Sequence, residues 1–154
     1  MRRRRPEKRK ILPDTKYNDL SVAKFINYIM ESGKKGVAEK IFYSAMELVN
    51  KKTKTDGIKI FKKGIENTSP SVEVKSRRIG GATYQVPIEV PKKRAFYLAS
   101  LWIINASKNS SGKPMSEKLA SELIAAANGD GNAIKKKEDT HRMADANKAF
   151  AHFR

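Results

Sequence analysis

The chain has 154 residues and a formal net charge of +17, from 33 Lys and Arg against 16 Asp and Glu. It has no cysteine, which excludes disulfide bonds and thiolate metal sites, and no apolar run long enough to cross a membrane. A basic excess of this size indicates a polyanionic partner, nucleic acid first and an anionic membrane second. Because no apolar segment follows the basic N-terminus as in a signal peptide, we expect a cytoplasmic protein.

The first ten residues, MRRRRPEKRK, carry seven basic side chains and one acidic side chain. They show no apolar periodicity, so residues 1–10 are predicted to be a disordered basic arm and residues 11–154 a single helical domain. Solvated or targeting tails have the same composition. The rest of the chain is also strongly basic, which favours an arm that binds nucleic acid.

Three helices are predicted before residue 70, because apolar residues recur there every three or four positions. Their bounds follow from capping residues and helix breakers. The first helix begins after Asp19 or Ser21 and ends by Gly33, the second covers about residues 35–51, and the third begins after Thr55 or Asp56.

Residues 71–90, SVEVKSRRIGGATYQVPIEV, are the part of the chain that reads as β-structure. Apolar and polar residues alternate on both sides of Gly80-Gly81, which predicts a β-hairpin inserted into the helical domain. A two-residue turn at these glycines would mix apolar and polar residues on each face. A three-residue loop would place Val72 opposite Val90 and Arg78 opposite Tyr84. We therefore predict an odd loop or a bulge.

This register would give the hairpin one apolar inner face, which we expect to close onto the helical body near its base. The face would consist of Val72, Val74, Val86, Ile88 and Val90. The tip, with Arg77, Arg78 and Tyr84, is expected to have little protein within reach and to meet RNA instead.

The segment Lys92-Lys93-Arg94 opens a fourth helix that runs to about Lys108 and is apolar nearly all round, so we expect it to be the central helix. Three cations at a helix N-terminus oppose the helix macrodipole. A bound phosphate would resolve this conflict, because exposed N–H groups and cations would then act together.

A fifth helix is predicted from Met115 to Asn128 and a sixth from about Asn132. On the sixth helix, Lys135 with Asp139 and Glu138 with Arg142 form oppositely charged pairs at i,i+4 spacing. The segment after residue 148 is too short and mixed for its structure to be predicted.

Catalysis has little support in the sequence. His141 and Asp145 lie one helical turn apart, but no nucleophile or second carboxylate accompanies them. Two histidines without cysteine do not indicate a zinc site, and no cofactor or small-molecule substrate is expected. A nuclease or RNA-modifying enzyme therefore remains only a rival interpretation.

Basic clusters recur where the helical scaffold turns, and five clusters besides the arm favour polyanion binding over a merely solvated surface. Arg78 and Tyr84 together would offer a cation and an aromatic ring to unstacked bases, although Tyr84 could equally anchor the hairpin. A DNA-architectural protein is a second rival, but the Gly-Gly-Ala tip has no apolar wedge. The candidate RNA-binding residues are Arg3, Arg4, Arg5, Lys8, Arg9, Lys10, Lys34, Lys35, Lys75, Arg77, Arg78, Tyr84, Lys92, Lys93, Arg94, Lys113, Lys135, Lys136, Lys137 and Arg142.

Two strings, VEVKSRRIGGATYQVPIEV and KKEDTHRMADANKAFAHFR, are highly specific. Through them the chain resembles, over nearly its whole length, the family of the bacterial small-ribosomal-subunit protein number seven. The resemblance implies a mainly α fold, a six-helix bundle with a protruding two-stranded antiparallel β-ribbon.

The resemblance also implies a structural ribosomal protein rather than an enzyme. It would be a primary binder of the 3′ domain of 16S ribosomal RNA that nucleates assembly of the 30S head. Its ribbon would lie near the exit-site transfer RNA and the messenger path, and its body would border neighbouring small-subunit proteins. Carried onto this chain, the family's RNA contacts fall on residues 3–10, Lys35, Lys75, Arg77, Arg78, Lys113, Lys136 and Arg142.

Overall fold

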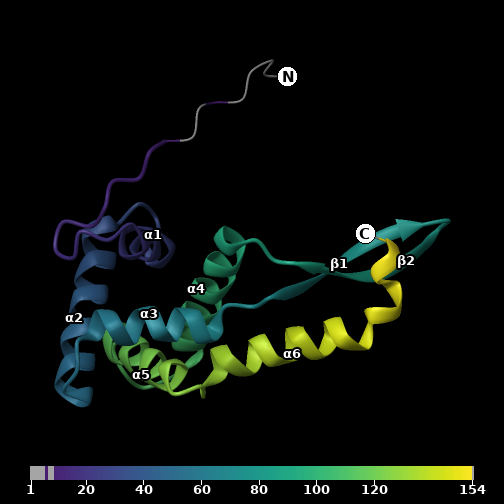
Figure 1. The fold of residues 1–154 in the computed structure, drawn as a ribbon. Coiled ribbons are helices and arrows are strands. Elements are labelled where there is room, and N and C mark those ends of the chain that lie inside the picture. Colours follow the sequence, from purple (N-terminus) through teal and green to yellow (C-terminus); the bar gives the residue numbers. More distant parts are fainter. Residues whose placement is uncertain (1–5, 7–8, 154) are drawn as a thin grey trace. The chain divides into compact units, whose positions relative to one another are not determined.

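The computed structural model describes residue 6 and residues 9–153 of the chain. These residues form six α-helices, a two-stranded antiparallel ribbon and a C-terminal 3-10 helix, which confirms the predicted fold class (Figure 1). The elements are α1 (Leu20–Ile29), α2 (Lys35–Thr53), α3 (Gly57–Thr68), β1 (Val72–Ile79), β2 (Ala82–Glu89), α4 (Lys92–Asn109), α5 (Met115–Ala127), α6 (Asn132–Ala146) and η1 (Lys148–Phe153).

The chain divides into two compact units, residues 1–39 and 40–154, and α2 begins in the first and continues in the second. In the first unit, α1 buries Val22, Phe25 and Ile26 on one face, as its periodicity predicted. That all of residues 11–154 form a single domain stays a prediction.

Two of the helices begin after a side chain that accepts a hydrogen bond from a backbone N–H group of the first turn. Asp19 accepts a hydrogen bond from the Ser21 N–H at 2.7 Å, so Asp19 rather than Ser21 caps α1. Asp56 accepts from the Ile58 N–H at 3.1 Å and caps α3. The predicted helix starts at Lys35, Lys92 and Met115 are confirmed to the residue.

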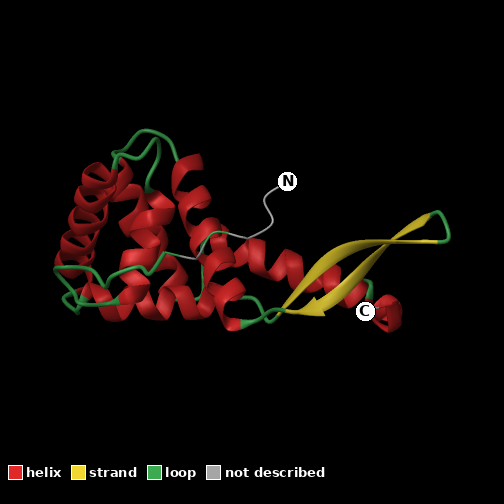
Figure 2. Ribbon diagram, turned by 90° about the horizontal axis from the view of Figure 1, so that it is seen from above, coloured by secondary structure: helices red, strands yellow, loops and turns green. Residues whose placement is uncertain are grey.

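In the second unit α4 lies against α3, α5 and α6, as expected of a central helix. Ile103 and Ile104 are fully buried on α4, and Leu119 and Leu123 on α5 face the same core. This packed group of helices is the platform from which the ribbon extends (Figure 2).

The register of the ribbon differs from the predicted one. Ile79 lies opposite Ala82, so β1 and β2 are joined by the two-residue turn Gly80-Gly81. The φ angles of these glycines are +57° and +92°. A type I′ turn needs positive φ at both central residues, and its twist matches that of the strands, so the turn geometry overrides the apolar alternation. The prediction of an odd loop or a bulge is therefore wrong.

This register also changes the two faces of the ribbon. Val72 lies opposite Glu89, so the valines at 72 and 74 occupy the face opposite to Val86 and Ile88. The predicted single apolar face is therefore wrong. The predicted pairing of Arg78 with Tyr84 is wrong as well, because Tyr84 lies opposite Arg77.

The ribbon rests on the C-terminal part of the chain. Figures 1 and 2 show α6 running beside the ribbon and η1 lying against β2. The His141 Nε2 atom on α6 accepts a hydrogen bond from the Ser71 N–H at 3.2 Å, just before β1. The 3-10 helix η1, which the sequence did not predict, places Phe150 against Tyr84, with 5.3 Å between the ring centroids.

Candidate nucleic-acid interface

The outer half of β1 presents three candidate cations to solvent. Lys75, Arg77 and Arg78 are all exposed. Because successive strand residues point to opposite faces, Lys75 and Arg77 share one face and Arg78 lies on the other. Cations on both faces allow the ribbon to meet phosphates from either side.

Tyr84 is half-buried, and its ring packs against Phe150 at a tilt of 55°. The prediction that the ribbon near Arg77, Arg78 and Tyr84 has little protein within reach is therefore wrong for Tyr84. The sequence does not indicate the contact of Phe150 with Tyr84, because the two residues lie far apart in the chain.

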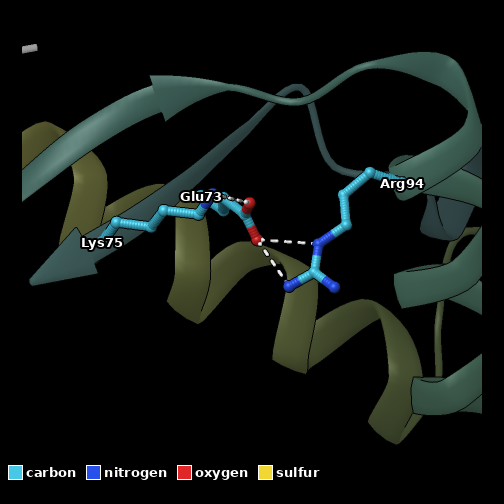
Figure 3. A network of polar contacts seen from close by, with 3 residues as sticks. All are labelled: Glu73, Lys75 and Arg94. Carbon is cyan, nitrogen blue, oxygen red and sulfur yellow. Dashed lines mark hydrogen bonds and ion pairs between the residues drawn. The ribbon is translucent and has the colours of Figure 1, made fainter. Parts of the chain in front are cut away.

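The start of α4 is tied to the base of the ribbon (Figure 3). Glu73, buried on β1, accepts hydrogen bonds from the Nη2 and Nε atoms of Arg94 at 3.1 and 3.3 Å. The Lys75 ammonium lies 3.9 Å from the same carboxylate. Glu73 thus brings the cations of β1 and of the α4 N-terminus close together, while Lys92 and Lys93 stay exposed.

Glu73 also affects the unfavourable placement of three cations at the N-terminus of α4, where the helix macrodipole is positive. The first turn of this helix contains no acidic residue and no side-chain cap. The carboxylate of Glu73 supplies the missing negative charge next to Arg94, which lies within that turn. Glu73 therefore balances the charge of Arg94 without a bound phosphate, whereas Lys92 and Lys93 stay exposed.

Four candidate residues lie on α6, and they differ in how far they are engaged within the chain. Lys135 and Lys136 are exposed. The Lys137 Nζ atom donates to the Asn67 carbonyl at 2.6 Å, and Arg142 lies 3.5 Å from Asp139 while remaining exposed. Lys113, in the loop between α4 and α5, is exposed as well.

In the first unit Arg9, Lys10 and Lys35 line one cavity of about 570 Å³, whose wall also includes Asp14 and Glu39. The Lys35 ammonium lies 4.0 Å from the Glu39 carboxylate. Lys34 is exposed next to it. The remaining arm candidates, Arg3, Arg4, Arg5 and Lys8, lie outside the described residues.

The described residues contain no group of three or more His, Asp or Glu side chains that could hold a metal ion. His141 is engaged with the Ser71 N–H, a contact that links α6 to the ribbon. In the part of the chain that the structure describes, no helix combines the length and apolar character needed to cross a membrane.

Comparisons with known proteins point to one family over almost the whole chain. The model of the family described as ribosomal protein S7p/S5e matches residues 1–148. A small ribosomal subunit protein uS7 from Anaeromyxobacter sp. (strain Fw109-5) is 60% identical over 153 residues, which cover 99% of this chain and 98% of that protein. Proteins of the same name from Thermotoga maritima and Gemmatimonas aurantiaca are 56% identical over 154 residues and 57% identical over 153, covering 99–100% of this chain and 98–99% of theirs. The chain therefore belongs to the ribosomal protein S7p/S5e family.

Proposed function

We propose that this chain is a primary 16S ribosomal RNA-binding protein of the 3′ domain that nucleates assembly of the 30S head. Its family consists of structural ribosomal proteins rather than enzymes, and as a member it is a constituent of the small subunit of the cytoplasmic ribosome. In our proposal the helices and the arm bind folded ribosomal RNA, and the ribbon reaches toward the exit-site transfer RNA and the messenger path.

The observation that carries this proposal is the set of exposed cations around the base and outer half of the ribbon. Lys75, Arg77 and Arg78 on β1 and Lys92 and Lys93 at the start of α4 all face solvent. Exposed cations spread over a ribbon and a helix end suit the phosphates of a folded RNA, which approach from several directions.

The experiment compares binding of the full chain to a 16S 3′-domain fragment with binding to random-sequence RNA of equal length. We expect the fragment to bind more tightly at moderate salt. Six to ten phosphate contacts predict an affinity loss of about 10³–10⁵ between 50 and 200 mM salt on duplex-like targets. Equal affinity for the two RNAs would contradict the proposal.

A duplex-DNA competitor tests the architectural alternative. The Gly-Gly-Ala tip itself has no apolar wedge, but Ile79 beside the turn is 39% exposed, and minor-groove proteins insert such apolar side chains between base steps. We expect structured RNA to displace duplex DNA from the protein, and the reverse order of displacement would favour DNA as the partner.

The ribbon's role can be separated from assembly by deleting residues 79–83. The contacts of Glu73, His141 and Phe150 lie outside this segment, so we expect the variant to fold and to bind the 3′-domain fragment. Subunits assembled with it are expected to hold exit-site transfer RNA less well. Loss of folding would show that the tip is a structural element.

A further inference from the structure

A second cavity lies in the helical part of the second unit, between α4 and α6. Its volume is about 320 Å³, near the lower end of the range for ligand sites in proteins. Its lining consists of Trp102, Asn105, Ala106, Asn109, Asn132 and Lys136.

The lining of this cavity combines one aromatic side chain, three amide side chains and one cation. Trp102, Asn105 and Asn109 follow one another at i, i+3 and i+7, so they share one face of α4. Trp102 is only half-buried, and the three asparagines and Lys136 are exposed. Within the described residues, the side chains of these five residues make no hydrogen bond or ion pair.

These side chains together match the parts of a nucleotide. An indole face can stack on a nucleobase. Each asparagine amide offers two N–H donors and a carbonyl acceptor, which fit the edges of a base, and the lysine ammonium suits a phosphate. A purely electrostatic RNA contact would require no aromatic ring and no group of uncharged amides.

We propose that this cavity receives one unstacked nucleobase of the bound ribosomal RNA, a step that rests on the proposed function. The base stacks on Trp102, the amides of Asn105, Asn109 and Asn132 bond to its edges, and Lys136 binds the adjoining phosphate. The rest of the surface would bind RNA through the charge of its phosphates. The cavity would add a contact that requires an unpaired nucleotide.

Trp102 is the one tryptophan of the sequence, so its fluorescence reports on the cavity directly. The full chain is titrated with the 16S 3′-domain fragment while binding is followed independently by filter retention. We expect the tryptophan emission to be quenched in parallel with binding and to become less accessible to acrylamide. Tight, specific binding with unchanged emission would overturn the cavity site and leave the proposed function intact, whereas absence of specific binding would remove both.

Substitutions test the individual contacts. Trp102→Ala is expected to weaken binding of the fragment by about 5- to 150-fold, the effect of losing one stacked base. Because Trp102 is half-buried, that variant could fail to fold, so Asn105→Ala provides an exposed alternative with an expected loss of about fivefold.

The matched control for Lys136→Ala is Lys59→Ala, which removes the same charge from an exposed position on α3. We expect the Lys136 variant to lose more affinity and to reduce the tryptophan quenching. Equal losses would show that Lys136 acts only through net charge and would overturn its phosphate contact. Equal quenching by adenosine monophosphate and by the fragment at the same concentration would assign the cavity to free nucleotides instead of RNA.

Discussion

Glu73 on β1 and Arg94 in the first turn of α4 form a two-point contact, with Glu73 Oε2 lying 3.1 Å from Nη2 and 3.3 Å from Nε of the arginine. Glu73 is 9% exposed, and the guanidinium also lies over the Tyr97 ring, 5.4 Å from its centroid. Arg94 therefore joins the ribbon to the helices, and its assignment to RNA stays a prediction. A buried carboxylate needs such a partner, because an unpaired one is costly to desolvate.

The first prediction concerns the energy of this contact. Arg94→Met should lower the free energy of unfolding by about 1–3 kcal/mol, since Glu73 would stay buried with only the more distant Lys75. Adding Glu73→Gln should recover part of that loss, with a coupling of about 0.5–3 kcal/mol. Urea unfolding of the wild-type protein, the two single variants and the double variant measures this coupling energy.

The control for this cycle is Lys93→Met, which removes an exposed cation next to Arg94. It should change the unfolding free energy by less than about 0.5 kcal/mol. Strictly additive effects of Glu73→Gln and Arg94→Met would mean that the two side chains do not stabilise each other.

The second prediction tests the ribbon register, using the absence of native cysteine. Ser76 lies opposite Gln85, and their side chains are hydrogen-bonded at 2.9 Å. Cysteines at these two positions should oxidise readily to a disulfide, because opposed strand residues bring their Cβ atoms close to disulfide distance. Cysteines replacing Arg77 and Gln85 would face each other only with a three-residue loop. Mass spectrometry without reductant should find the crosslink in the first pair, and preferential crosslinking of the second would restore the rejected register.

The third prediction concerns the contact between Tyr84 and Phe150. Phe150→Ala should release η1 from β2, with a loss of about 0.5–1.5 kcal/mol beyond the buried area. Hydrogen exchange should accelerate in residues 148–153 and in β2 and stay unchanged in α4 and α5. Uniformly faster exchange in all helices would show that Phe150 supports global stability rather than the local contact.

The fourth prediction separates exposed from engaged arginines in RNA binding. Arg78→Gln removes an exposed cation and should reduce the slope of log affinity against log salt by about 1. Arg94→Gln should reduce it by clearly less, because Glu73 already neutralises this guanidinium. Filter binding of the 3′-domain fragment at several salt concentrations gives both slopes, with circular dichroism confirming that each variant is folded. Equal reductions would place Arg94 in direct contact with RNA.

Local rules explain why the helices could be predicted from the sequence. Helix starts depend on side chains a few residues away, as at Asp56, and helix faces depend on apolar spacing within one segment. The hairpin and its glycine turn were local features as well. The apolar alternation predicts the wrong register because a Gly-Gly turn favours positive φ at both of its central residues, and this turn fixes which strand residues pair.

The sequence by itself determined the helices, the existence of the ribbon, the basic charge and, through two specific strings, the family. Only the tertiary structure decided which charged and aromatic side chains are engaged within the protein. Arg94 and Lys93 are alike in the sequence, yet one holds Glu73 and the other is free of that contact. Such differences arise from packing between segments far apart in the chain, which brings Glu73 to α4 and Tyr84 to η1, and spacing within one segment does not encode them.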